Sequence, residues 1–195
     1  MVVAFDFLDV MAWDVALSAI LLGLGALSLP YNSQEGRVED KARGSRLGFA
    51  IMLGAGGAYL FLSGSLIGFM WPFALSNGVY NVLFGGIAAL GGLLLLGGSV
   101  ALALNANLRP VTYVAAVVGL YGVVDAYAII AYSLTREPLL SALGYLSFSG
   151  AAVLSVPAAL FGNKRWRLVF AVFAFLFAIA WMYQAANFTF GHLKP

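Results

Sequence analysis

This chain of 195 residues has no cysteine, a single histidine and few charged residues. The lack of cysteine excludes disulfides, thiolate chemistry and cysteine-ligated iron–sulfur clusters. The single histidine, His192, excludes bis-histidine haem, a histidine copper site and an intramembrane serine–histidine pair. Neither a P-loop nor a GxGxxG motif occurs. We therefore expect a protein that is not an enzyme and has no catalytic residues, no metal site and no cofactor.

Apolar sequence is what the chain has in abundance. Hydrophobic residues make up 63% of it and charged residues 9%, and its mean hydropathy is +0.96. A bilayer solvates so much apolar surface, whereas one soluble core could not bury it. Each of six continuous runs exceeds the roughly 20 residues that span the hydrocarbon core, which predicts membrane-spanning helices. The runs cover residues 8–29, 47–69, 82–104, 111–134, 139–161 and 168–188. The expected fold class is all-α, a polytopic membrane protein in which residues 1–195 form one domain.

Positive charge alternates from loop to loop. Only Arg136 and Lys194 fall between or after the runs on one side, and the other eight Lys and Arg residues fall on the other side. These eight are Arg37, Lys41, Arg43, Arg46, Arg109, Lys164, Arg165 and Arg167. By the positive-inside rule, the loops that carry them are cytoplasmic and both termini lie outside the cell membrane. This asymmetry explains the net charge of +2 without nucleic acid, so the expected partner is the lipid bilayer.

Glycine and loop length suggest how the helices pack. The short loops predict three antiparallel hairpins, each with a basic loop at its cytoplasmic end. The chain has 23 glycines, and small residues let membrane helices approach closely. Gly64 and Gly68 form a GxxxG pair in the second run, where we expect a packing contact. Such helices also favour a homo-oligomer or contact with other membrane subunits.

Asp125 lies near the middle of the fourth run and is the main candidate for a polar site within the membrane. A carboxylate at this depth costs about 2.5–3.5 kcal/mol on insertion scales, so it should face the bundle interior, a cavity or a partner. Tyr121 and Tyr132 fall on the same face of the predicted helix and could donate hydrogen bonds to it. The site is either a proton- or cation-sensitive centre or a buried acid that holds helices together.

Three further polar residues are secondary candidates. Asp14 lies about one turn inside the first run, where its side chain could reach the outer interface. Gln184 and Asn187 are three residues apart, which places both amides on one face of the sixth run near its outer end.

Several local strings resemble those of a known protein family. They are Trp71-Pro72, Tyr80-Asn81-Val82-Leu83-Phe84-Gly85, Tyr121-Gly122, Ala126-Tyr127-Ala128-Ile129 and Leu154-Ser155-Val156-Pro157. Together they resemble a family of small archaeal polytopic membrane proteins with no assigned function, over the second to fifth runs. The resemblance implies an archaeal source and no mechanism. A looser architectural likeness to the amide and urea channel family rests on the similar length, the six helices and the external termini, with Leu83-Phe84-Gly85 as the only local match.

Two hypotheses of different classes follow. One is a non-catalytic structural or accessory subunit of a membrane assembly, which the glycine-rich runs and the scarcity of polar residues favour. The other is a channel or transporter for a small solute or ion, with Asp125 as its sensitive site.

Overall fold

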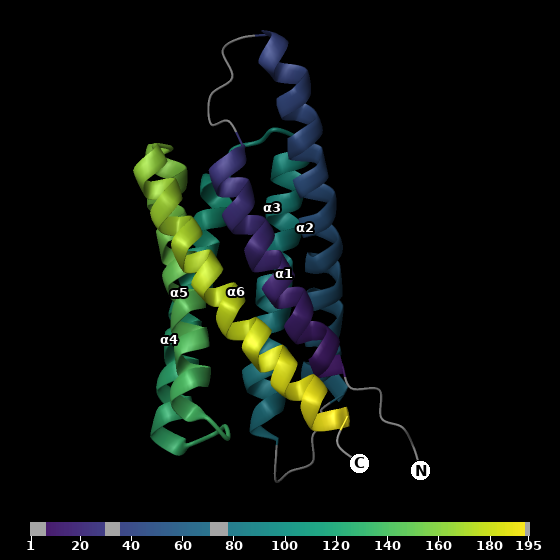
Figure 1. The fold of residues 1–195 in the computed structure, drawn as a ribbon, viewed down its shortest axis with the longest axis vertical. Coiled ribbons are helices and arrows are strands. Elements are labelled where there is room, and N and C mark those ends of the chain that lie inside the picture. Colours follow the sequence, from purple (N-terminus) through teal and green to yellow (C-terminus); the bar gives the residue numbers. More distant parts are fainter. Residues whose placement is uncertain (1–6, 30–35, 71–77, 194–195) are drawn as a thin grey trace.

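The structure, a computed structural model, describes residues 7–29, 36–70 and 78–193. Its elements are α1 (Phe7–Ser28), α2 (Gly36–Met70), the π-helical η2 (Asn81–Gly86), α3 (Ile87–Ala103), α4 (Arg109–Tyr132), α5 (Pro138–Phe161) and α6 (Lys164–Leu193). They form a bundle of long helices (Figure 1). Six spans are long and apolar enough to cross a membrane, with η2 and α3 forming one of them. These findings confirm the prediction of an all-helical chain with six such spans, and the described residues contain no strand.

The helices extend beyond the apolar runs at two places. α2 begins at Gly36, although its apolar run begins only at Leu47, so most of the segment expected as a loop is helical. α6 likewise begins at Lys164, four residues before its run. Hydropathy marks where a helix enters lipid, and it does not mark where the helix begins, because Lys, Arg and Glu are good helix formers in water.

The start of the third span is not an ordinary α-helix. Residues Asn81–Gly86 form a π-helix, a rare geometry that occurs frequently at functional sites. Asn81 is only 1% exposed there, and the Leu83 carbonyl accepts a hydrogen bond of 2.8 Å from the Tyr145 hydroxyl of α5. The π segment thus joins the third and fifth spans.

Three pairs of helices have the largest interfaces: α2 with α3, α4 with α5, and α1 with α6. Figure 1 shows α6 running obliquely along α1. These pairs differ from the expected hairpins, in which each helix pairs with its neighbour across a basic loop. α3 and α4 have the smallest interface of any two consecutive membrane spans. Short loops keep consecutive helices near each other, but they do not determine which helices pack most closely.

Close backbone contact explains the α2–α3 pair. A Cβ added at Gly64 would collide with the backbone of Ala89 and lie 2.8 Å from the Gly85 carbonyl oxygen. A Cβ at Gly92 of α3 would meet the Gly57 carbonyl oxygen of α2 at 2.7 Å. Gly68 differs, because no described atom lies within 4 Å of the position where its Cβ would be. The geometry thus agrees with the expected packing contact at Gly64, whereas a side chain at Gly68 meets no described residue.

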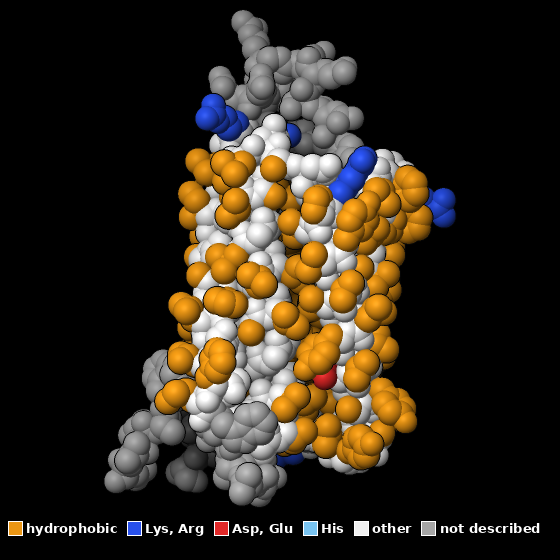
Figure 2. Space-filling model, turned by 180° about the vertical axis from the view of Figure 1, so that it is seen from behind, with side chains coloured by type: hydrophobic (Ala, Val, Ile, Leu, Met, Phe, Trp, Pro, Cys, Tyr) orange, Lys and Arg blue, Asp and Glu red, His pale blue; other side chains and the backbone are white. Residues whose placement is uncertain are grey.

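The outer surface of the bundle is apolar. Figure 2 shows hydrophobic side chains over the whole height of the visible face, while most of the Lys and Arg side chains gather toward one end. Residues such as Leu120 and Val124 of α4 are each 61% exposed. An apolar surface of this extent on a long helical bundle is suited to contact with lipid.

A buried core fills the opposite end of the bundle from most of these charges. We call this region the core end, and its buried hydrophobic residues are Met11, Ala12, Ala16, Leu60, Ile67, Leu83, Phe84, Ala88, Ala126, Ile129, Ala142, Tyr145, Trp181 and Ala185. They come from every span, so all six helices are joined there.

Candidate functional site

A cavity of about 770 Å³ lies inside the bundle. Its lining includes residues of all six α-helices, and it extends along α1 from Met11 to Leu29. The cavity volume lies within the about 300–1,000 Å³ common for small-molecule sites.

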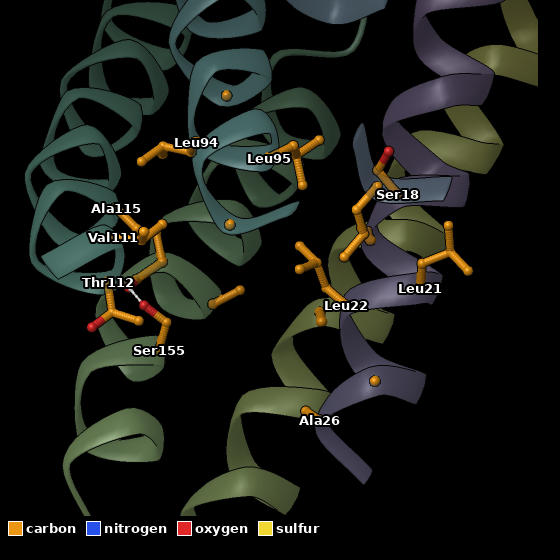
Figure 3. Close-up of a pocket in the computed structure, with 18 of the residues that line it drawn as sticks. Ser18, Leu21, Leu22, Ala26, Leu94, Leu95, Val111, Thr112, Ala115 and Ser155 are labelled. Carbon is orange, nitrogen blue, oxygen red and sulfur yellow. Dashed lines mark hydrogen bonds between the residues drawn. The ribbon is translucent and has the colours of Figure 1, made fainter. Parts of the chain in front are cut away.

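Apolar side chains form most of the cavity wall. Figure 3 shows Leu94 of α3 and Val111 and Ala115 of α4 on one side, and Leu22 and Ala26 of α1 on the other. The cavity lining contains no Asp or Glu among the described residues. A hydrocarbon chain would therefore meet matching apolar surface over most of its length.

Aromatic rings close the cavity toward the core end. Phe84, Tyr145 and Trp181 line the cavity and also belong to the buried core, and we call these three residues the aromatic floor. The ring of Trp181 packs edge-on against Phe84 with centroids 6.4 Å apart and lies 6.1 Å from Tyr145. The hydrogen bond from Tyr145 to Leu83 fixes one of the three rings. The three rings therefore form part of the cavity wall where it meets the buried core.

Three arginines surround the other end of the cavity. Arg46, Arg109 and Arg167 all belong to its lining, and we call this end the basic end. The exposed residues Arg109 and Asn105 are part of the lining, so the cavity reaches the surface here.

Each arginine also ties together one of the three closest helix pairs. Arg167 of α6 donates to the carbonyls of Ala26 and Leu29 at the end of α1. Arg109 of α4 donates to the Leu160 carbonyl near the end of α5, at 3.5 Å. Arg46 of α2 donates to the Asn105 side chain just beyond α3. Cations are favourable at helix C-termini because the carbonyls there carry partial negative charge.

Asp125 is buried behind the aromatic floor. Its side chain is 5% exposed, and its Oδ2 has no hydrogen-bond partner within the described part of the chain. Tyr121 and Tyr145 both lie close enough to the carboxylate for a Coulombic interaction. Tyr132 is 73% exposed and is not brought to Asp125. The two residues share a helix face but are seven residues apart, a rise of about 10 Å that a tyrosine hydroxyl does not bridge.

Asp14 has a setting similar to that of Asp125. Its Oδ1 lies 2.9 Å from the Cβ position of Gly56, and its Oδ2 is buried without a hydrogen-bond partner among the described residues. Tyr59 of α2 is its aromatic neighbour. The expectation that this side chain reaches the outer interface is wrong, because the carboxylate packs between α1 and α2.

Gln184 and Asn187 are not brought together. Gln184 donates a hydrogen bond of 3.3 Å to Ser141 of α5, whereas Asn187 is exposed. Within the described residues, no three His, Asp or Glu side chains lie close enough to hold a metal ion.

Comparison with known proteins assigns a family without a function. The model of the family described as protein of unknown function (DUF981) matches residues 1–195. This chain belongs to that family. No curated protein and no solved structure matches it. The match agrees with the resemblance to a membrane protein family of unassigned function and extends it to the whole chain, while the archaeal source and the likeness to amide channels stay predictions.

Sequence reasoning missed the cavity and its arginines. A residue that faces an apolar cavity is as hydrophobic as one that faces lipid, so no periodicity distinguishes them. From the sequence, these three arginines indicate only the orientation of the chain in the membrane. Their position was a usable signal, since each one precedes an apolar span closely enough to lie at its end.

Proposed function

We propose that this protein is a non-catalytic membrane protein that binds an apolar or amphiphilic small molecule inside the bundle. The cavity of about 770 Å³ with its apolar wall is the observation that carries this proposal. Apolar cavities that reach a surface offer a preformed site, and the cost of binding falls when the site is preorganised.

The aromatic floor favours a binding protein or carrier over an open channel. A channel needs a continuous path across the bilayer, and here Phe84, Tyr145 and Trp181 lie across the cavity's inner end. A carrier that opens in turn to each side would need this floor to move.

Native mass spectrometry of the protein purified in a nonionic detergent tests the proposal. We expect a co-purified or added hydrophobic compound to remain bound to the wild type and to be lost from Ala115→Trp, which fills the cavity. Val117→Trp is the matched control, because Val117 lies on the same helix and is 66% exposed on its outer side. Equal binding to the two variants would contradict the proposal.

The orientation in the membrane is part of the same proposal. We place the basic end in the cytoplasm and both termini outside the cell, on the positive-inside rule. Single cysteines are easily introduced, because the natural chain has none. An impermeant thiol reagent applied to intact cells should label Tyr132→Cys and spare Gly44→Cys, and the reverse pattern would overturn the orientation.

A second candidate is transport of a solute or ion that depends on Asp125. The supporting observation is the buried Oδ2 of Asp125 beside Tyr145, a residue of the aromatic floor. Protonation or cation binding at this carboxylate could thus be coupled to movement of the floor. Asp125→Asn should fold normally and lose any pH-dependent solute flux in liposomes, and an unchanged pH profile of flux would exclude this candidate.

The structure gives little support to the role of an accessory subunit. The glycines that suggested it pack largely within the chain, as Gly64 and Gly92 do at the α2–α3 interface. An assembly with other copies or other subunits would still be detected as a larger mass in the same native spectra.

A further inference from the structure

The charges at the mouth of the cavity differ sharply from its wall. Three guanidinium groups, those of Arg46, Arg109 and Arg167, line the mouth, whereas the lining beyond them is mostly apolar. No Asp or Glu among the described residues shares the lining with them. The cavity is therefore apolar along its length and positive at one end.

The contacts of Arg109 and Arg167 leave N–H donors that can bind an anion. A guanidinium has five N–H donors, and Arg167 directs two of its nitrogens to the carbonyls of Ala26 and Leu29. Arg109 makes one contact of 3.5 Å, at the outer limit of a hydrogen bond, to the Leu160 carbonyl. The carbonyl oxygens that these two arginines contact carry only partial charge, about half a unit per helix end, so they orient the two guanidinium groups without neutralising them.

We propose that the cavity binds an amphiphile with an anionic head group, its hydrocarbon chain in the cavity and its head group at Arg46, Arg109 and Arg167. This inference rests on the proposed function and adds the chemical class of the bound molecule. Guanidinium groups match phosphate and carboxylate in charge and in hydrogen-bond geometry. The chain extends from the basic end toward the aromatic floor, which limits its depth.

A free anion and a neutral chain would each match only one part of the cavity, so each is a poorer occupant than an anionic amphiphile. A free phosphate would occupy the mouth and leave the apolar wall uncovered. A neutral hydrocarbon would fill the wall and leave the guanidinium groups of Arg109 and Arg167 at the mouth without an anionic partner among the described residues. The anionic amphiphile alone satisfies both parts of the cavity.

Titration followed by native mass spectrometry in nonionic detergent tests this inference with three probes: dodecyl phosphate, dodecanol and inorganic phosphate. We expect dodecyl phosphate to bind at least about tenfold more tightly than dodecanol, a difference that corresponds to one or more charge-assisted contacts. Inorganic phosphate alone should not bind. Arg109→Gln should remove most of this preference and leave dodecanol binding within twofold of the wild type. Arg165→Gln is the matched control, since Arg165 is exposed at the same end and does not line the cavity.

Arg109 is the best position for this test because its single long contact contributes little to folding. Arg167→Lys is a second variant that keeps the charge but loses the bidentate geometry, and it should retain part of the preference. Competition between dodecyl phosphate and phosphatidic acid in zwitterionic nanodiscs then distinguishes a single-chain molecule from a lipid of the bilayer.

The possible outcomes separate this inference from the proposed function. Equal binding of dodecyl phosphate and dodecanol, unchanged in Arg109→Gln, would overturn the anionic class and leave apolar binding intact. Absence of binding by every amphiphile would overturn the proposed function itself. Loss of the preference in Arg165→Gln as well would show attraction by the general surface charge, and would also overturn the inference.

Discussion

The two ends of the bundle contain similar residues but differ in how they are filled. At the core end, large side chains such as Ile129 and Trp181 fill the space between the six helices. Toward the basic end, the three close pairs are each held by an arginine, while the space between the pairs remains open and lined by residues such as Gly25, Ala26 and Gly98. Packing at one end thus provides the stability that allows the other end to stay hollow.

The same difference suggests how the two ends contribute to function. Interiors with few voids tolerate little change in volume, whereas a cavity accepts added atoms at low cost. We expect substitutions at the core end to act on folding, and substitutions around the cavity to act on binding. Substitutions at matched positions of the two ends test this expectation.

The largest effect should come from Gly64→Leu. A side chain there would meet the backbone of Ala89, which cannot rotate away, so the loss should exceed the about 1–3 kcal/mol typical of overpacking. We expect little folded, monodisperse protein in size-exclusion chromatography. Gly68→Leu, one turn along the same helix, should purify and unfold like the wild type, because no described atom lies within 4 Å of its Cβ position. Similar behaviour of the two variants would show that the α2–α3 contact is not as close as described.

A second comparison enlarges one alanine at each end of α4. Ala126 is 2% exposed in the filled core, and Ala126→Leu should lower the free energy of unfolding by about 1–3 kcal/mol. Ala115 lines the cavity, and Ala115→Leu should leave stability unchanged or raise it. Thermal unfolding in the same detergent measures both. If Ala115→Leu were the more destabilising change, the space beside it would already be filled.

Tyr145→Phe should have a smaller effect. It removes the buried hydrogen bond to the Leu83 carbonyl and should cost about 1 kcal/mol. Tyr127→Phe is the control, since Tyr127 is 72% exposed and should lose nothing measurable. The difference in midpoint of thermal unfolding between the two variants measures the bond, and no difference would mean that the hydroxyl does not anchor the floor.

The smallest effect on stability should come from Asp125→Leu. Removing a hydrogen-bonded acid that holds helices together would lower the free energy of unfolding by about 1–3 kcal/mol. Oδ2 of Asp125, however, has no hydrogen-bond partner among the described residues. We therefore expect the midpoint of unfolding to stay the same or to rise. A clear fall would indicate that Asp125 holds the helices together, and would weaken the case for a sensitive site.

Sequence patterns predicted the spans well because bilayer thickness sets a length that composition reveals directly. The apolar runs gave the six spans, although α2 and α6 begin before theirs, and Asp125 is buried as expected. The predictions that failed depend on distances in three dimensions. Tyr132 shares the face of Asp125 and lies too far along the axis, and Gly68 shares a motif with Gly64 although no described atom lies within 4 Å of its own Cβ position.

The cavity could not be predicted for a more general reason. In a soluble protein, polar positions reveal which face of a helix is outside, whereas here lipid-facing, core and cavity positions are all apolar. Val117 and Ala115 of α4 show this, since only their positions in three dimensions tell the lipid face from the cavity. The π-helix at Asn81–Gly86 was missed likewise, because nothing in its sequence separates it from the α-helix that follows.

The accessibility of single cysteines tests most directly whether one end is hollow and the other filled. The chain has no cysteine of its own, so Ala115→Cys and Ala126→Cys each present one thiol on the same helix. We predict that N-ethylmaleimide, a small uncharged reagent, alkylates Ala115→Cys in the folded protein and that added dodecyl phosphate slows the reaction. Ala126→Cys should react only after unfolding. Equal rates for the two thiols in the folded protein, with no protection by dodecyl phosphate, would contradict the hollow basic end.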